Sequence, residues 1–292
     1  TDVTTGAKVT TEFKLNLDAE TDVSEGVVIS PLSTLLVSGE LDEAGLKAKL
    51  GIDAYIDIFS YDPIAAAEAA GNLGDTAAAE IALQFKSAST QVSNFLDVGA
   101  STIGQSTGVE KDQAMFGVID SLIQKFAPDD PIDFADTTFL SSAIDIAAQT
   151  LVTEMPDFEF DFTSLDQVKS TTVTKLGDLN QKIEDAIANT SDVGAALSEM
   201  YKSAKVAQDD LEAKIEEIFA AETIDATLLQ SFGSFDLDAA LGEVDLDAEI
   251  PEFNLIGNAT FDGDWGWTDA TVVDGAYFRN VAEPGHAHEA NL

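Results

Sequence analysis

The sequence contains no cysteine and only two histidines, His286 and His288. The lack of cysteine excludes disulfide bonds, thiolate metal ligands and thiol nucleophiles. Both histidines lie in a polar C-terminal tail, so a Ser–His–Asp triad would lack a histidine from the folded body. The H-x-H pair has the spacing to hold Cu²⁺ or Zn²⁺ on one face of a strand, but without fixed further ligands we expect weak binding.

Basic residues are also scarce, with 14 Lys and Arg against 54 Asp and Glu and a formal net charge of −40. Nucleic acids and anionic membrane surfaces are bound through basic patches, so we expect neither as a partner. The sequence has no run of about 18 apolar residues, and we therefore expect no membrane span. Self-repulsion of this size is tolerable where salt screens it or divalent cations neutralise it.

The 292 residues include 45% hydrophobic ones, enough for a buried core in one large or two medium domains. Few lysines, many Asp, Thr and Ser, and no cysteine together indicate an exported protein of a marine or halophilic microbe. An acidic cytoplasmic protein is the alternative. The chain begins with Thr1 instead of Met, which suggests a processed or excised product.

Apolar residues recur at helical spacing through the middle of the chain. Asp75 is a candidate N-cap for a helix over 76–96, and further helices are predicted over 111–126 and 139–152. Small residues at 99–108 predict a loop. Two longer patterns, 168–187 and 193–218, are close to heptads and predict an antiparallel αα-hairpin of roughly 35 Å per arm.

The two ends of the chain favour β-structure instead. Alternation over Val9–Leu17 predicts a half-buried strand. Residues 232–247 look extended and Asp-rich, and residues 253–280 look like a β-meander with turns at Asp262-Gly263 and Asp274-Gly275. We therefore predict an α+β fold, with a mainly helical body, a long αα-hairpin, an N-terminal strand and a C-terminal β-rich segment. The predicted domains are 1–160, 161–225 and 226–292.

Residues 27–63 carry the most local information. An apolar run reaches Ser30-Pro31, where Ser is a candidate N-cap and Pro a candidate first helical residue. A short helix, a second helix over 41–50 and an acidic loop are predicted to follow. This order is similar to a helical module of large secreted adhesins and surface-layer proteins of marine bacteria, which carry cadherin-like or RTX repeats. The resemblance covers roughly the first 100 residues. The matching segments are Ile29-Ser30-Pro31-Leu32-Ser33-Thr34-Leu35-Leu36, Glu43-Ala44 with Leu50-Gly51-Ile52, Asp57 with Tyr61-Asp62-Pro63, and Gly74-Asp75.

Acidic loops are candidate calcium sites, because Ca²⁺ prefers six to eight oxygen ligands on a flexible loop. The alternative is that these acids are solvated and maintain solubility. The sequence contains neither the EF-hand pattern nor a G-G-x-G-x-D array. The candidate ligands are Asp53, Asp57 and Asp62 in one loop, Asp262, Asp264 and Asp269 near the C-terminus, and Asp129, Asp130, Asp133 and Asp136 around two prolines.

Aromatic residues gather near the C-terminus. Trp265 and Trp267 share one face of a predicted hairpin and, with Tyr277, form a candidate sugar-stacking platform. A hairpin core or a contact between subunits is the alternative.

The resemblance implies an extracellular surface role. We expect a non-enzymatic structural protein that self-associates into a surface filament, sheath or surface layer through its terminal strands. A calcium-dependent adhesin or a glycan-binding module is the alternative.

Overall fold

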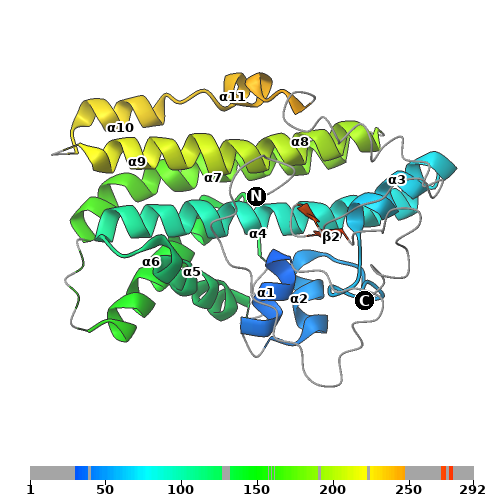
Figure 1. Ribbon diagram of the computed structural model, residues 1–292, viewed down its shortest axis with the longest axis horizontal. Helices are drawn as coiled ribbons and strands as arrows, with labels where there is room; N and C mark the ends of the chain where they lie inside the picture. The colour runs from blue at the N-terminus through cyan, green and yellow to red at the C-terminus, as the bar shows by residue number, and fades with distance from the viewer. Residues whose placement is uncertain are drawn as a thin grey trace, which may run out of the picture.

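A computed structural model describes residues 30–38, 41–126, 132–156, 158, 160, 162–189, 192–221 and 224–246, and the backbone of 271–273 and 276–278. The first eight of these segments form a helical bundle (Figure 1). Its helices are α1 (Pro31–Ser38), α2 (Glu43–Leu50), α3 (Pro63–Leu73), α4 (Thr76–Thr107), α5 (Lys111–Phe126), α6 (Thr137–Glu154), α7 (Phe162–Asn189), α8 (Val193–Lys205), the π-helix η1 (Val206–Leu211), α9 (Glu212–Ala220), α10 (Ala226–Gly233) and α11 (Leu237–Glu243).

Helix α4 lies in the centre of the bundle (Figure 1). It contacts α1, α3, α5, α6, α7, α8, η1 and α9. As a result, every residue from 85 to 104 is buried, on all sides of the helix. The predicted apolar face of α4 is confirmed, with Phe85, Val92 and Phe95 fully buried.

The predicted loop at 99–108 is wrong, because α4 continues to Thr107 and ends at Gly108 in the left-handed conformation. Small residues serve close packing here. A Cβ atom at Gly104 would lie 3.0 Å from the carbonyl oxygen of Val109. The run of small residues therefore marks a helix that its neighbours approach closely.

The αα-hairpin is confirmed. α7 packs against α8, η1 and α9, which follow one another without a break. Asp192 caps α8 by accepting a hydrogen bond from the backbone N–H of Ala195 (3.2 Å). Of the apolar positions predicted in α7, Leu176, Leu179 and Ile183 are fully buried.

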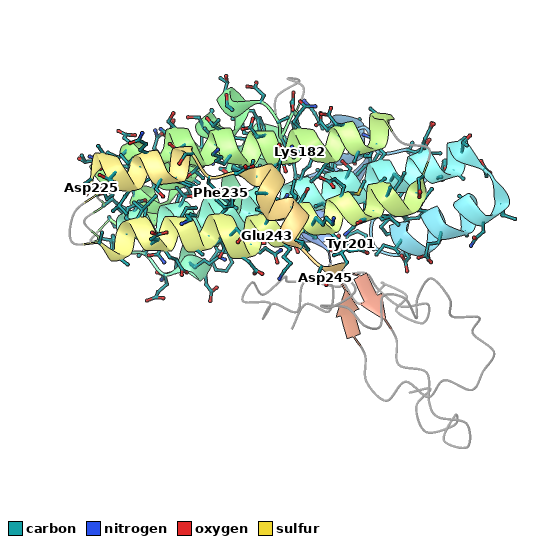
Figure 2. The ribbon with its side chains drawn as sticks, turned by 90° about the horizontal axis from the view of Figure 1, so that it is seen from above. Lys182, Tyr201, Asp225, Phe235, Glu243 and Asp245 are labelled. Atoms are coloured by element: carbon teal, nitrogen blue, oxygen red, sulfur yellow. The ribbon has the colours of Figure 1, made fainter. Side chains whose placement is uncertain are left out.

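Helices α10 and α11 lie across the hairpin (Figure 2). This arrangement corrects the extended structure predicted for 232–243, the part of the 232–247 prediction that α10 and α11 cover. Asp236 is the N-cap of α11, where it accepts from the backbone N–H of Ala239 (3.1 Å). Lys175 of α7 donates to the carbonyl oxygen of Phe235 (2.8 Å), and Lys182 pairs with Asp238. The alternating Asp and apolar residues reflect capping and packing onto α7 and α8, not a strand.

The predicted α+β fold class is wrong, because the described part is almost entirely helical, with 81% of its residues in helices. The structure does pair β1 (Thr271–Val273) with β2 (Ala276–Phe278) antiparallel, but two strands of three residues form no layer of the fold. The predicted strand at 9–17 and the residues 253–270 lie outside the described segments. One hydrophobic cluster extends from Leu32 in α1 to Leu241 in α11.

Aspartate starts most of the helices in the described part. In seven of these helices a side-chain oxygen of the aspartate before the helix accepts a hydrogen bond from the first turn, where the helix dipole also favours negative charge. The N-cap residues are Asp42, Asp62, Asp75, Asp136, Asp192, Asp225 and Asp236. Before α1, Ser30 has the predicted capping role, since its Oγ accepts from the backbone N–H of Ser33 (3.1 Å).

Candidate functional site

The three aspartates of the predicted calcium loop each anchor a local turn or a helix start. Their backbone N–H donors are Tyr55 for Asp53 (3.2 Å), Phe59 for Asp57 (2.9 Å), and Ile64 and Ala65 for Asp62 (both 3.0 Å). Within the described segments, no group of three or more Asp, Glu or His side chains is arranged to hold a metal ion. Calcium binding by Asp53, Asp57 and Asp62 stays a prediction.

A lysine ammonium already contacts this loop. The Nζ atom of Lys47, in α2, donates to the carbonyl oxygens of Ala54 (2.9 Å) and Ile56 (2.7 Å) and pairs with Glu43 (3.0 Å). Lys47 is only 8% exposed. The ammonium therefore contacts oxygen ligands of the kind that a bound metal cation would use.

The remaining predicted site residues lie partly inside and partly outside the described segments. Asp133 accepts from the backbone N–H groups of Ala135 (2.8 Å) and Asp136 (3.2 Å), and Asp136 caps α6. The predicted site residues that fall outside the described segments are Asp129, Asp130, Asp262, Asp264, Trp265, Trp267, Asp269, His286 and His288. Tyr277 lies in β2, where its backbone pairs with Val272.

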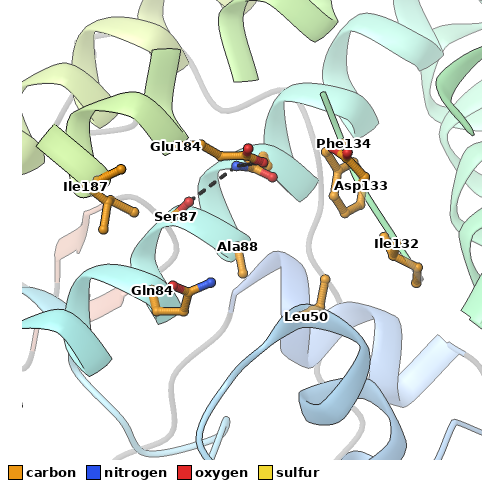
Figure 3. Close-up of a pocket in the computed structure, with 11 residues that line it drawn as sticks. Leu50, Gln84, Ser87, Ala88, Ile132, Asp133, Phe134, Glu184 and Ile187 are labelled. Atoms are coloured by element: carbon orange, nitrogen blue, oxygen red, sulfur yellow. Dashed lines mark hydrogen bonds between the residues drawn. The ribbon is translucent and has the colours of Figure 1, made fainter. Parts of the chain in front are cut away.

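The structure has a pocket of about 450 Å³ between α4 and α7, which we call the α4–α7 pocket (Figure 3). The 132–134 segment and the last residue of α2 complete its wall. Its lining residues are Leu50, Gln84, Ser87, Ala88, Gln91, Ile132, Asp133, Phe134, Glu184, Ile187 and Ala188. This volume lies within the range of small-molecule sites, which are mostly apolar with a few convergent polar groups.

Polar groups from both helices converge in the α4–α7 pocket. Gln91 of α4 donates through Nε2 to the Oγ of Ser87 and to the Oε1 of Glu184, both at 3.3 Å. Burial raises the pKa of Glu184, the nearby carboxylate of Asp133 raises it further, and the hydrogen bond from Gln91 lowers it. A half-buried carboxylate with a raised pKa in a pocket is a recurrent property of functional sites.

Two asparagines connect the pocket's helices to the 132–134 segment. Asn94 of α4 donates to the Oδ1 of Asn180 in α7 (3.2 Å), and Asn180 donates to the carbonyl oxygen of Phe134 (3.0 Å). Both asparagines are fully buried. A Cβ atom at Gly177 of α7 would lie 2.8 Å from the carbonyl oxygen of Ala135, so only glycine allows this approach. The pocket wall at 132–134 is therefore fixed by side chains and by backbone contact.

A part-buried polar cluster joins α4, α5, η1 and α9. Lys111 Nζ lies 2.7 Å from both carboxylate oxygens of Glu212 and 3.9 Å from the Oδ1 of Asp97. Gln208 donates to the Oδ2 of Asp97 (3.3 Å) from η1, a π-helical segment of the kind that often marks functional sites. Burial raises the pKa of Glu212 to about 7, although the Lys111 ammonium opposes this shift. We call these four residues the Lys111 cluster.

Neither the pocket nor the Lys111 cluster was anticipated from the sequence. Gln91 and Glu184 are 93 residues apart in the chain, and the spacing of apolar residues in the two helices does not indicate which of their polar residues meet. One signal was present, because residues 85–104 include just two charged residues, Lys86 and Asp97, in a chain of net charge −40. A helix segment with so few charges in so acidic a protein indicates burial on all sides.

The described helices include none whose length and hydropathy would allow it to cross a membrane. The search against models of protein families, the search of curated proteins and the search of solved structures each found no match for this chain.

Proposed function

We propose that this chain is a non-enzymatic structural module of an extracellular protein, a subunit of a surface filament, sheath or surface layer. The observation that carries the proposal is that aspartate side chains cap the helices. Seven helices of the described part begin with an Asp N-cap. The carboxylates thus support the scaffold, and each stabilises a helix start by about 1 kcal/mol.

The shape of the bundle supports a role as a spacer. Helix α4 has 32 residues and α7 has 28, which correspond to lengths of about 48 and 42 Å. The two helices pack along each other, and α8, η1 and α9 lie alongside them (Figure 1). Two buried hydrophobic clusters fill the bundle along its length, which suits a spacer.

The charge supports an extracellular and salty setting. With a net charge of −40, repulsion between exposed carboxylates opposes the folded state unless the ionic strength is high. The proposal includes self-association of the protein through its predicted terminal strands. The deletion of residues 1–22 tests it, because soluble monomers are expected from a chain that lacks the strand predicted at 9–17.

Two imaging experiments test the proposal. Immunogold labelling of the source cells with an antibody against residues 30–246 is expected to mark the cell surface or extracellular material. Electron microscopy of the purified native protein in high salt, with and without calcium, is expected to show filaments, sheaths or sheets. Label confined to the cytoplasm would contradict the extracellular assignment, and monodisperse particles in every condition would contradict self-association.

A further inference from the structure

The residues that line the α4–α7 pocket from α4 and α7 are spaced as on one face of each helix. Gln84, Ser87, Ala88 and Gln91 follow the i, i+3, i+4, i+7 spacing of one helix face. Glu184, Ile187 and Ala188 follow the same spacing on α7 (Figure 3). Two rigid helices therefore present the lining side chains, and such positions are more precise than those on loops.

The interior of the pocket holds one carboxylate in a fixed place. Gln91 and Ser87 are 6% and 4% exposed, and their hydrogen bond places the Gln91 amide against Glu184. Figure 3 shows Glu184 near Ser87, with Asp133 on the facing segment. The Glu184 side chain is therefore oriented by buried partners before any ligand arrives.

The charge of the lining is entirely negative. Glu184 and Asp133 are its only charged residues, and no Lys, Arg or His is among the eleven lining residues. A positive group placed between these carboxylates would be attracted by both. The remaining lining includes the aliphatic side chains of Leu50, Ile132 and Ile187, which favour an organic body over a hydrated metal ion.

We propose that the α4–α7 pocket binds a small organic cation with a primary ammonium group on a short aliphatic chain. The ammonium carries three hydrogen-bond donors, which match the acceptor oxygens of Glu184 and Asp133. The aliphatic chain lies against Leu50 and Ile187. A quaternary ammonium fits less well, because it has no N–H donors and is usually held by an aromatic cage, whereas Phe134 is the only aromatic lining residue.

Calorimetry with three probes of equal chain length tests this proposal on the full chain. The probes are pentylammonium chloride, pentanol and sodium pentanoate, titrated in about 0.5 M sodium chloride, where the Debye length of about 4 Å suppresses diffuse binding to the acidic surface. We expect pentylammonium to bind at least about tenfold more tightly than pentanol, since hydrogen bonds to charged groups are the stronger ones. No binding is expected for pentanoate. Equal affinity for pentylammonium and pentanol would overturn the proposal.

Three variants locate the binding site. Glu184→Gln removes the charge while keeping the size of the side chain, and Ala188→Leu fills the rim of the pocket without a change of charge. Both are expected to weaken pentylammonium binding by about tenfold or more. Asp185→Asn removes an exposed carboxylate on the next residue of α7 and is expected to change the affinity less than about twofold.

Equal losses in Glu184→Gln and Asp185→Asn would show diffuse attraction to the surface and overturn the proposal. So would unchanged binding in Ala188→Leu with an unaltered circular dichroism spectrum. Calcium chloride is titrated in parallel. Calcium binding that Glu184→Gln abolishes, together with no pentylammonium binding, would overturn the proposal in favour of a metal site.

Discussion

The ammonium of Lys47 lies 2.7 Å from the carbonyl oxygen of Ile56, and the two residues connect α2 to the acidic loop that follows it. The aspartates of this loop accept hydrogen bonds from backbone N–H groups. The positive charge that contacts the loop is the Lys47 ammonium, which belongs to the same chain. Ile56 is 2% exposed, and its position in the core depends on the path of this loop.

Replacement of Lys47 by methionine is expected to lower the free energy of unfolding by roughly 2–3 kcal/mol. The variant leaves the carbonyl oxygens of Ala54 and Ile56 without their donor, and an orphaned buried acceptor costs about 1–3 kcal/mol. Urea titration followed by circular dichroism measures the loss. Lys49→Met, two residues away in the same helix, is the control, and an equal loss in both variants would contradict the role of Lys47.

The same loop provides a test of the calcium prediction. If Asp53, Asp57 and Asp62 bind calcium, the ion will raise the melting temperature in proportion to the logarithm of its concentration. Thermal melts of the wild type in calcium chloride and in EGTA are compared with those of Asp57→Asn. A calcium-dependent shift that this variant retains in full would place the ion elsewhere.

The Lys111 cluster predicts a pH-dependent stability. The pKa of Glu212 in the folded protein is about 7, above its ordinary value of 4.5. The folded protein therefore holds an additional proton between these pH values, and rising pH lowers the free energy of unfolding. Glu212→Gln removes this term. We subtract the free energy of unfolding of this variant from that of the wild type. This difference is expected to fall by up to roughly 3 kcal/mol between about pH 4 and pH 8.

The measurement is a series of urea titrations across this pH range. Glu80→Gln, at an exposed site in α4, is the matched control. Its difference in free energy of unfolding from the wild type is expected to stay constant within about 0.5 kcal/mol across the pH range. A flat difference for Glu212→Gln would mean that Glu212 is ionised throughout.

The two buried asparagines make separable contributions. Asn180→Leu removes the acceptor of Asn94 and the donor of the Phe134 carbonyl, and is expected to cost roughly 2–4 kcal/mol. Asn94→Leu removes one hydrogen bond and is expected to cost roughly 1–2 kcal/mol. A double-mutant cycle in urea should yield a coupling energy of about 1 kcal/mol. Strictly additive costs would show that the 3.2 Å contact contributes no stability.

Glycine at 177 is required by the backbone of the 132–136 segment. Gly177→Ala places a methyl group 2.8 Å from the carbonyl oxygen of Ala135. We expect a net loss of roughly 1–3 kcal/mol from this overpacking, even though alanine is the better helix former. Gly242→Ala in α11 meets no atom within 4 Å and should stabilise the protein by up to about 1 kcal/mol. Thermal melts that rank the two variants in the opposite order would contradict this packing.

The periodicity of apolar residues correctly predicts the helices in which one face is buried. It located the αα-hairpin and the apolar stripe of α5, in which Val118 and Leu122 are fully buried. It failed where aspartates alternate with apolar residues. The short helix α11 has the same pattern as a strand over a few residues, because a helix of seven residues makes only about two turns.

The candidate site was beyond the reach of the sequence for a different reason. The α4–α7 pocket depends on which turn of α4 faces which turn of α7, and a periodic pattern leaves this register open. The hydrogen bonds from Gln91 to Glu184 and from Asn94 to Asn180 both require this one register of α4 against α7. The polar residues 84, 87 and 91 also lie on a face that an amphipathic interpretation assigns to solvent.

The burial of α4 on all sides determines how the bundle comes apart. A helix with a single apolar stripe can lose one neighbour and keep the rest, but residues 85–104 touch a partner in every direction. Peripheral elements such as α10 and α11 can open individually, whereas exposure of the middle of α4 to solvent hydrogen exchange requires the whole cooperative unit to open. Under a stretching force the module is therefore expected to unfold cooperatively in a single step, and not to lengthen gradually.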